Sequence, residues 1–252
     1  MEYEIRSDTG RKRTVNEDEA AVFVHSEMKT MLAVIADGMG GHKGGDFASA
    51  TAVRMLGEQF MSADKEVVTE QDWIDLLYDA IVDINQFLYI TAQEDDTYKG
   101  MGTTLDLALI LDDHCVVFHV GDSRIYQVTG KAIRQITKDH SFVNVLIDSG
   151  EITEQEAEVH PQRNWIMKAV GSEKSIVPDR YSFPLLPHSY VLLCTDGLSN
   201  KIEKEKMLDI MLNQSSLADK ADEFIDLANQ RGGEDNITVI LLAIPEIEVT
   251  PV

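Results

Sequence analysis

The 252-residue sequence contains only two cysteines, Cys115 and Cys194, which excludes a small fold held together by disulfides. Both lie in apolar segments, where a small buried side chain is expected. Long apolar runs are also missing. No window reaches about 18 apolar residues, and the N-terminus lacks a basic region followed by an apolar stretch. The sequence therefore predicts neither a membrane span nor a signal peptide, and we expect a cytoplasmic protein.

Basic residues are scarce. The chain has 22 Lys and Arg against 44 Asp and Glu, which gives a formal net charge of −22 at pH 7. A surface of this sign repels phosphate backbones and anionic lipid head groups, so we expect neither nucleic-acid nor membrane partners. The same charge favours a monomer, because like-charged copies repel one another. Disorder is not expected, since 44% of the residues are hydrophobic and recur with regular periodicity.

Linkers, internal repeats and low-complexity runs are absent as well, so nothing in the composition divides the chain. We therefore expect a single domain over residues 1–252. A domain of this length can bury a sizeable core without a disulfide or a structural metal.

Apolar periodicity predicts the secondary structure. Strands are expected near residue 4 and over 20–25, 31–36, 103–111, 114–120, 124–128, 190–195 and 236–244. Helical spacing predicts two consecutive helices, and two more before the last strand. Their apolar stripes are Ala48, Ala52, Met55, Leu56 and Phe60 in the first, and Trp73, Leu77, Ala80, Ile81, Ile84, Phe87 and Leu88 in the second.

Irregular sequence follows between about residues 138 and 171. It contains a short helix that ends near Gly150 and another that opens with Thr153 and Glu156 in capping-box spacing. Elsewhere, short connections between successive strands imply antiparallel pairing. The predicted fold class is α+β, with antiparallel sheets packed together and helices outside.

Four aspartates stand where predicted strands end or begin. Asp37, Asp122 and Asp196 follow apolar runs, and Asp235 precedes the last strand. A single Asp-Gly after a strand is an ordinary turn. Loops at one edge of a layered sheet can converge, however, and four converging carboxylates repel one another unless cations lie between them. The pattern therefore indicates a metal cluster.

The types of ligand narrow the choice of metal and reaction. Carboxylates and carbonyls suit magnesium or manganese, whereas zinc would bring a tight Cys or His cluster, and the calcium-loop pattern is missing. A metal pair with bridging carboxylates suits hydrolysis of a phosphate ester, because a bound water becomes a nucleophile near neutral pH. Arg13, in the polar segment GRKRTVNED, could hold the phosphate, although alone it is more typical of a solvated surface charge.

Seven ordered motifs resemble the metal-dependent serine/threonine protein phosphatases of the PP2C, or PPM, type in their compact bacterial form. The motifs are RTVNED (13–18), DGMGGHKGGDFAS (37–49), GMGTT (100–104), GDSR (121–124), GEITEQEAEVHPQRNWIMKAVG (150–171), CTDGL (194–198) and EDNITV (234–239). The resemblance implies a β-sandwich of two antiparallel sheets flanked by helix pairs. It implies hydrolysis of phosphoserine and phosphothreonine monoesters in proteins by a metal-activated water, opposing a bacterial Ser/Thr kinase.

The resemblance also assigns the metal ligands. Asp37 would bridge two Mn²⁺ or Mg²⁺ ions, with the carbonyl of Gly38 binding one of them. Asp196 and Asp235 would hold the other ion. Asp122 and Asp196 would form a weaker third site.

Further roles follow from the same resemblance. Arg13 would hold the substrate phosphate and so share the catalytic work with Asp37, while Glu17 and Asp18 would orient metal-bound waters. The stretch from about residue 141 to 171 would be a flap beside the site. Asn164 stands where some bacterial members carry a Ser associated with the third metal, so its amide oxygen is a candidate ligand.

Two questions stay open in the sequence. Met39 occupies the position of a His often assigned as the general acid in eukaryotic members, which leaves His42, His140 or a water as proton donor. A phosphatase with an aspartate nucleophile is disfavoured, because Asp37 does not begin a D-x-D pattern. The alternative from another class is an inactive phosphopeptide-binding module that kept the fold.

Overall fold

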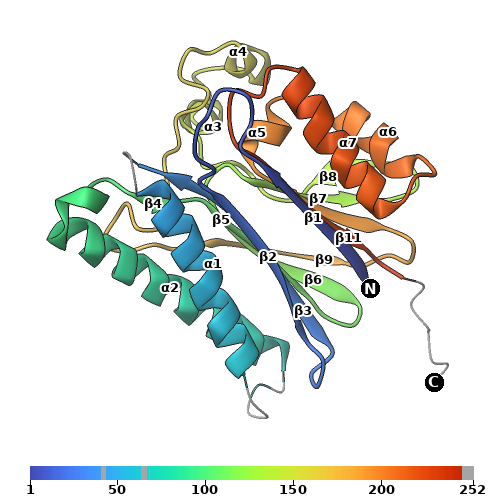
Figure 1. The fold of residues 1–252 in the computed structure, drawn as a ribbon, viewed down its shortest axis with the longest axis horizontal. Coiled ribbons are helices and arrows are strands. Elements are labelled where there is room, and N and C mark those ends of the chain that lie inside the picture. Colours follow the sequence, from blue (N-terminus) through green and yellow to red (C-terminus); the bar gives the residue numbers. More distant parts are fainter. Residues whose placement is uncertain (41–43, 64–66, 68, 246–252) are drawn as a thin grey trace.

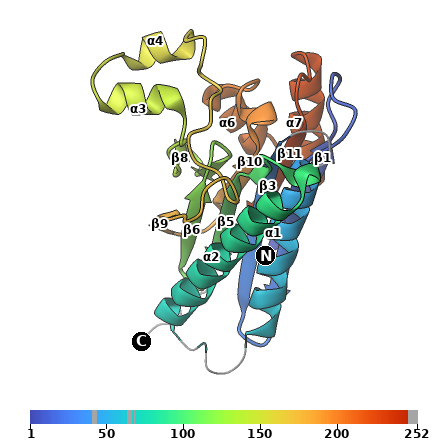
Figure 2. The same ribbon diagram turned by 90° about the vertical axis from the view of Figure 1, so that its left-hand side faces the viewer.

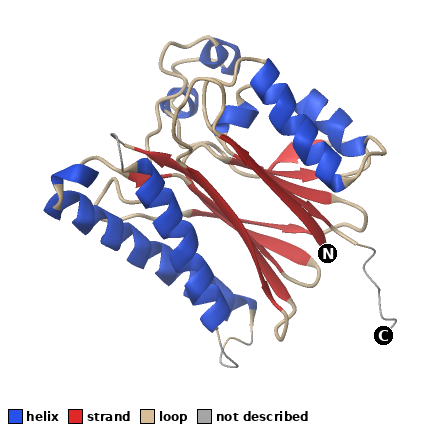
Figure 3. Cartoon of the chain, viewed as in Figure 1, coloured by secondary structure: helices blue, strands red, loops and turns tan. Residues whose placement is uncertain are grey.

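Two antiparallel sheets packed face to face form the centre of the molecule, and helices cover their outer faces (Figure 1, Figure 3). The computed structural model describes residues 1–40, 44–63, 67 and 69–245. The first sheet has the strand order β1–β11–β10–β7–β8, and its strands are β1 (Glu2–Asp8), β11 (Ile237–Ala243), β10 (Tyr190–Cys194), β7 (Arg124–Val128) and β8 (Ile133–Gln135).

The second sheet has the order β2–β3–β5–β6–β9, with a short strand, β4, paired to β3. Its strands are β2 (Asp18–His25), β3 (Thr30–Met39), β5 (Leu105–Ile110), β6 (His114–Val120), β9 (Asp179–Pro184) and β4 (Gly102–Thr103). The predicted fold class, α+β with two antiparallel sheets and outer helices, is therefore confirmed.

Each sheet has its own pair of covering helices. Apolar side chains of α1 (Gly45–Ser62) and α2 (Glu70–Glu94) pack on the second sheet, and those of α6 (Lys204–Leu212) and α7 (Leu217–Gln230) pack on the first. A short helix, α5 (Asp196–Ser199), follows β10, and a 3₁₀ turn, η1 (Asp96–Tyr98), follows α2. No helix among the described residues combines the length and apolar composition that a bilayer crossing requires.

Two further helices stand apart from the layers. Figure 2 shows α3 (Phe142–Asp148) and α4 (Glu154–Glu158) outside the stacked sheets and helices. Helix α4 begins with the capping box predicted from the sequence: the hydroxyl of Thr153 accepts the backbone N–H of Glu156, and the Glu156 carboxylate accepts that of Thr153.

The side chains of the central strands alternate between two apolar layers. In β3, Leu32 and Val34 pack toward α1 and α2, whereas Ala33 and Ile35 pack toward the other sheet. Because both faces are buried, the strand is a continuous apolar run in the sequence instead of an alternating one.

The structure departs from the predicted elements in several places, and neither α5 nor η1 was predicted. Strands β8 and β9 were not predicted, because β8 has three residues and β9 has few apolar side chains and ends at Pro184, which an edge strand tolerates. Phe87 was placed in the buried stripe of α2 but is 43% exposed. Ile84 and Leu88, one turn apart, form the buried face, and Phe87 projects beside it.

Candidate metal centre

The four predicted aspartates come from both sheets, at the end of the molecule where α5 lies (Figure 1). Asp37 lies in β3 of the second sheet, and Asp122 lies in the loop between β6 and β7. Asp196 is the first residue of α5, directly after β10, and Asp235 precedes β11. Asp18 begins β2 and is the cross-strand partner of Asp37.

Electrostatic repulsion shows that these carboxylates converge. Burial, followed by the negative charges of Asp18, Asp196, Asp122 and Asp235, raises the pKa of Asp37 well above its usual value. Burial and Asp196 raise the pKa of Asp122 in the same way. Burial and Asp235 raise the pKa of Asp196 to about 6. Each carboxylate thus disfavours ionisation of its neighbours, as expected when like charges share a partly buried site.

Two threonines of the first sheet hold the carboxylate of Asp18. Its Oδ2 accepts hydrogen bonds from Thr195 Oγ1 at 2.9 Å and Thr238 Oγ1 at 2.7 Å. Both bonds favour the ionised form, but burial outweighs them and raises the pKa of Asp18 to about 7. The sequence analysis gave these threonines no role, although they lie in the motifs CTDGL and EDNITV beside predicted ligands.

Thr104 fixes the backbone that carries Asp37. Its Oγ1 accepts the N–H of Asp37 at 2.9 Å, and its own N–H donates to the Asp37 carbonyl at 2.8 Å. The same hydroxyl is hydrogen-bonded to Ser123 Oγ at 2.8 Å, so one residue links the Asp37 strand to the loop of Asp122. The next residue, Gly38, must be glycine, because a Cβ there would lie 2.1 Å from the carbonyl oxygen of Gly45.

Arg13 lies at the exposed edge of the site. Its Nη2 is 3.0 Å from Asp235 Oδ2, and 48% of its side chain is exposed. Asp235, Glu17 and Asp37 all raise the pKa of Arg13, which opposes the lowering by burial. The guanidinium is therefore a positive group at the exposed side of this carboxylate cluster, with about half of its surface free to meet a ligand. Arg124 is a second positive group, which lowers the pKa of Asp122 and Asp196.

Glu17 joins three segments of the site. Its carbonyl accepts Ser49 Oγ at 2.6 Å and the N–H of Gly38 at 3.0 Å, and its N–H donates to Asn236 Oδ1 at 2.9 Å. Burial raises the pKa of its carboxyl, while Arg13 opposes that shift. The predicted Glu17 and Asp18 are thus both brought to the aspartates.

The side chains present fit a hard divalent cation. One buried oxygen of each of Asp18, Asp122 and Asp196, in each case Oδ1, has no hydrogen-bond partner in the structure. Buried carboxylate oxygens normally have a donor, and a cation satisfies the same need. Among the described residues, no group of three or more Asp, Glu, His or Cys side chains has the spacing of a complete ion-binding shell. The oxygen-only donor set therefore matches magnesium or manganese, which keep several waters.

The structure does not bring Asn164 to the aspartates. Asn164 is exposed in a turn and lines a cleft of about 780 Å³ together with residues such as Arg124, Asp139 and Lys204. No hydrogen bond found for the described residues joins it to Asp122 or Asp196. The cleft reaches the site through Asn200, which donates from Nδ2 to Asp196 Oδ2 at 3.1 Å. His42 lies outside the described residues.

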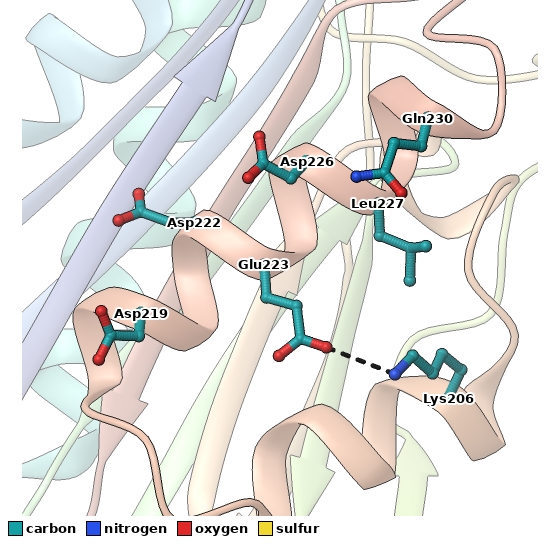
Figure 4. A pocket seen from close by; sticks show the side chains of 7 residues that line it. All are labelled: Lys206, Asp219, Asp222, Glu223, Asp226, Leu227 and Gln230. Carbon is teal, nitrogen blue, oxygen red and sulfur yellow. Dashed lines mark hydrogen bonds and ion pairs between the residues drawn. The ribbon is translucent and has the colours of Figure 1, made fainter.

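A separate pocket of about 410 Å³ lies between α6 and α7 (Figure 4). Glu223 points toward Lys206 across it, and their Oε1 and Nζ are 3.4 Å apart. The remaining lining is mostly acidic, and none of the predicted site residues lines it.

Sequence comparison identifies the family. The family described as Protein phosphatase 2C matches residues 9–240. Protein phosphatase PhpP of Streptococcus pneumoniae is 40% identical over 248 residues, which cover 98% of each chain. The chain belongs to the protein phosphatase 2C family. The resemblance predicted from the sequence is confirmed, and the chain is a PP2C-type serine/threonine protein phosphatase, a hydrolase that acts on phosphoproteins.

Solved PP2C-type structures share the fold. A serine/threonine phosphatase from S. agalactiae matches with a TM-score of 0.92 and 36% identity, covering 97% of this chain and 99% of that one. The catalytic domain of the phosphatase PstP, in complex with two manganese ions, matches with a TM-score of 0.80 and 31% identity over 96% of this chain and 98% of that one. A relative with this fold thus binds two manganese ions, which supports metal dependence in this phosphatase.

Proposed function

We propose that this PP2C-type phosphatase hydrolyses phosphoserine and phosphothreonine in proteins with two tightly held divalent ions and a weaker third ion. The observation that carries the proposal is the set of Asp18, Asp122 and Asp196 oxygens left without donors at a half-exposed arginine, Arg13. Such a site needs cations to relieve its repulsion, and it presents a guanidinium where a phosphate dianion would approach.

Each aspartate has a separate task in this proposal. Asp37, whose carboxyl is repelled by Asp18, Asp196, Asp122 and Asp235, would hold both ions of the tight pair, and the carbonyl of Gly38 would bind one of them. Asp196 and Asp235 complete the pair, and Asp122 shares the third ion with Asp196, its strongest acidic neighbour. When bound, the ions lower the pKa of water and neutralise charge on the phosphoryl oxygens. Manganese or magnesium fits this all-oxygen set.

The residues around the ligands bind and orient. Arg13 holds the phosphate by its guanidinium fork, exchanging part of its contact with Asp235 for the substrate. Asp18 keeps one oxygen on Thr195 and Thr238 and presents the other to the site, and Glu17 flanks it. Together they orient water at the ligands. We do not assign the proton donor to His140, because its Nδ1 accepts the N–H of Gly121 at 3.0 Å and its Nε2 faces Asp179.

The wider context is part of the same proposal. We assign one domain to residues 1–252, with the flap over 141–171, which contains α3 and α4 (Figure 2). Asn164, on the flap, reaches the third ion only if the flap moves toward Asp122. The excess of acidic residues supports a monomer without nucleic-acid or membrane partners. The proposed phosphoprotein substrates include a Ser/Thr kinase, as the family resemblance implies, and the proposed location is the cytoplasm.

Turnover of p-nitrophenyl phosphate tests the proposal. Activity should disappear in excess chelator and return with manganese or magnesium, and the Asp37→Ala variant should stay inactive after metal is added back. Full activity in chelator, or restoration by zinc alone, would contradict the ligand assignment. Absence of turnover with every metal, combined with retained binding of a phosphopeptide, would favour the inactive binding module.

A further inference from the structure

Gly121 and His140 form a reciprocal pair of hydrogen bonds beside Asp122. The N–H of Gly121 donates to His140 Nδ1 at 3.0 Å, and the N–H of His140 donates to the Gly121 carbonyl at 2.7 Å. Gly121 has a φ of +113°, and a Cβ there would lie 2.6 Å from Thr104 Cγ2. Gly121 has no side chain, so it is held through its backbone N–H and carbonyl, and His140 is the hydrogen-bond partner of both.

His140 also contacts the flap. Its carbonyl accepts the N–H of Met167 at 2.8 Å, near the end of the flap segment 141–171. At the start of that segment, the N–H of Phe142 donates to the Trp165 carbonyl at 2.8 Å. Since the two ends of the flap meet at His140, this residue joins the base of the flap to the loop of Asp122.

The contacts of His140 define one tautomer. A nitrogen that accepts an N–H cannot carry a proton, so Nδ1 is bare and the ring proton is on Nε2. Nε2 lies 3.3 Å from Asp179 Oδ2 without the geometry of a hydrogen bond, and Lys168 Nζ donates to Asp179 Oδ1 at 3.2 Å. The ring is therefore neutral when it holds Gly121.

A buried ion pair beneath His140 favours the same neutral form. Both nitrogens of His119 face acceptors, with Nδ1 at 2.5 Å from Asp106 Oδ1 and Nε2 at 3.0 Å from the Lys138 carbonyl. Burial lowers the pKa of His119, but the facing Asp106 outweighs it and raises the pKa above the usual value. The ring of His119 stacks on that of His140 with centroids 4.7 Å apart. Burial, then the positive His119 and Lys168, lower the pKa of His140 to about 4 despite Asp179.

We propose that His140 is a positioning residue: its imidazole, held in the Nε2–H tautomer by the N–H of Gly121 and kept neutral by the His119–Asp106 pair beneath it, fixes the Gly121–Asp122 loop and couples that loop to the flap. The coupling runs from a fully buried ion pair through a ring stack to His140, and from His140 by backbone hydrogen bonds to the residue before a predicted metal ligand. The effect of His140 on turnover rests on the proposed function of Asp122 as a metal ligand. The tautomer of His140 and its hydrogen bonds to Gly121 do not depend on that proposal.

Side-chain ¹H–¹⁵N NMR of the full-length, chelated protein near pH 7 tests the tautomer without any substitution. We expect one histidine with a bare Nδ1 and a protonated Nε2, assigned to His140 by its loss in His140→Asn, and one with both nitrogens protonated, assigned to His119. An Nδ1–H tautomer or a protonated ring at His140 would overturn the proposal, whatever the activity of the enzyme.

Amide exchange of Gly121 in the same chelated protein tests the loop contact. His140→Leu removes the acceptor, whereas His140→Asn retains an oxygen near the position of Nδ1. A lost hydrogen bond should speed Gly121 exchange about five- to tenfold in the Leu variant, with most of the protection restored in the Asn variant. His160→Leu is the matched control, because His160 Nδ1 also accepts a backbone N–H, that of Gln162, at 3.2 Å but makes no contact with Gly121.

Single-turnover kinetics with phosphopeptide and added manganese then separate the effect of His140 on the loop from its effect on turnover. We expect the Leu variant to lower kcat about tenfold with little change in KM, and the Asn variant to recover most of kcat. Altered exchange without a change in kcat would contradict the role of Asp122 but leave the loop contact standing. Equal exchange in wild type and both variants would overturn the positioning role itself.

Discussion

Thr238 and Asp18 connect the two sheets at the metal centre: the Thr238 hydroxyl of the first sheet donates a 2.7 Å hydrogen bond to the Asp18 carboxylate of the second. Thr195 donates to the same oxygen and accepts the N–H of Thr238 at 3.0 Å. One carboxylate oxygen thus serves as a structural anchor, while the other, Oδ1, is left without a donor. The ligand loops of both sheets depend on this contact for their relative position.

Thr238→Val should weaken the junction between the sheets. Valine has the same shape but cannot donate, and a hydrogen bond to a buried carboxylate contributes about 1.5–3 kcal/mol. We expect the free energy of unfolding to fall by about that amount in urea, above pH 8 where Asp18 is ionised. A double-mutant cycle with Asp18→Asn isolates the pair, and a coupling energy near zero would show that the contact is not energetically significant.

The chelated protein should be less stable at pH 8 than at pH 5. Asp18 and Asp196 have pKa values of about 7 and about 6 in the folded protein against an ordinary 3.8, so between these values the folded state binds more protons than the unfolded state. Stability therefore decreases as pH rises through this window, by about 4 kcal/mol between pH 5 and pH 8, because one pKa unit corresponds to about 1.4 kcal/mol. Thermal melting with and without manganese measures the effect.

Saturating manganese should abolish most of this pH dependence, since bound cations favour the ionised carboxylates. Asp18→Asn should flatten the slope in the chelated protein, whereas Asp83→Asn, on the exposed face of α2, should leave it unchanged. An identical slope in all three proteins would mean that titration of the site does not determine the stability.

The position of the aspartates could be predicted from the sequence, but their anchors could not. Asp37, Asp122 and Asp196 each follow a long apolar strand, so the local pattern alone places them at strand ends. Thr195 and Thr238 bond Asp18 only because two sheets pack in one particular register, and that information is not local. The relative placement of residues far apart in the chain is a property of tertiary packing.

His140 and Asn164 show that a position near a motif in the sequence does not by itself predict a place in the site. His140 was a candidate proton donor because its motif lies near the others in sequence, yet its Nδ1 accepts the Gly121 N–H and its Nε2 faces Asp179. Asn164 was a candidate ligand by its place in a motif, but it is exposed in a turn of the flap, and Figure 2 shows the flap helices outside the stacked layers. Proximity in sequence did not specify direction in space.

Arg13→Ala should affect substrate binding far more than stability. The Arg13–Asp235 ion pair is half exposed, and such pairs contribute about 1 kcal/mol or less. Loss of the guanidinium should raise KM for a phosphopeptide about ten- to a hundredfold, because bonds to a phosphate are charge-assisted. Arg13→Lys should recover only part of the affinity, since lysine lacks the planar fork.

Arg11→Ala is the control for this experiment, because Arg11 is exposed in the same loop. It tests whether KM responds to the loss of any nearby positive charge. Equal increases in KM for the Arg11 and Arg13 variants would show that the substrate is attracted by the general positive charge of the loop and not by a specific contact between Arg13 and the phosphate. An unchanged KM for Arg13→Ala would identify this residue as an ordinary solvated charge.

Replacement of Asp122 and of Asp37 by alanine should have different effects on metal binding and turnover. Burial, then Asp196 and Asp139, raise the pKa of Asp122, whereas four other carboxylates raise that of Asp37. Asp122→Ala should therefore retain the fold and the two tight ions but lose most turnover, while Asp37→Ala should lose the tight pair. Removal of either charge relieves repulsion, so neither variant should melt lower than wild type in chelator.

Calorimetric titration with manganese and single-turnover kinetics on both variants measure this difference. An ion held mainly by water binds weakly, so wild type should show two tight binding events and a weaker one, and only the weaker one should vanish in Asp122→Ala. If Asp122→Ala hydrolyses phosphopeptide at the wild-type rate, the third ion has no part in the reaction. If it loses the tight pair as Asp37→Ala does, Asp122 belongs to the same cluster of ligands, and the separate third site does not exist.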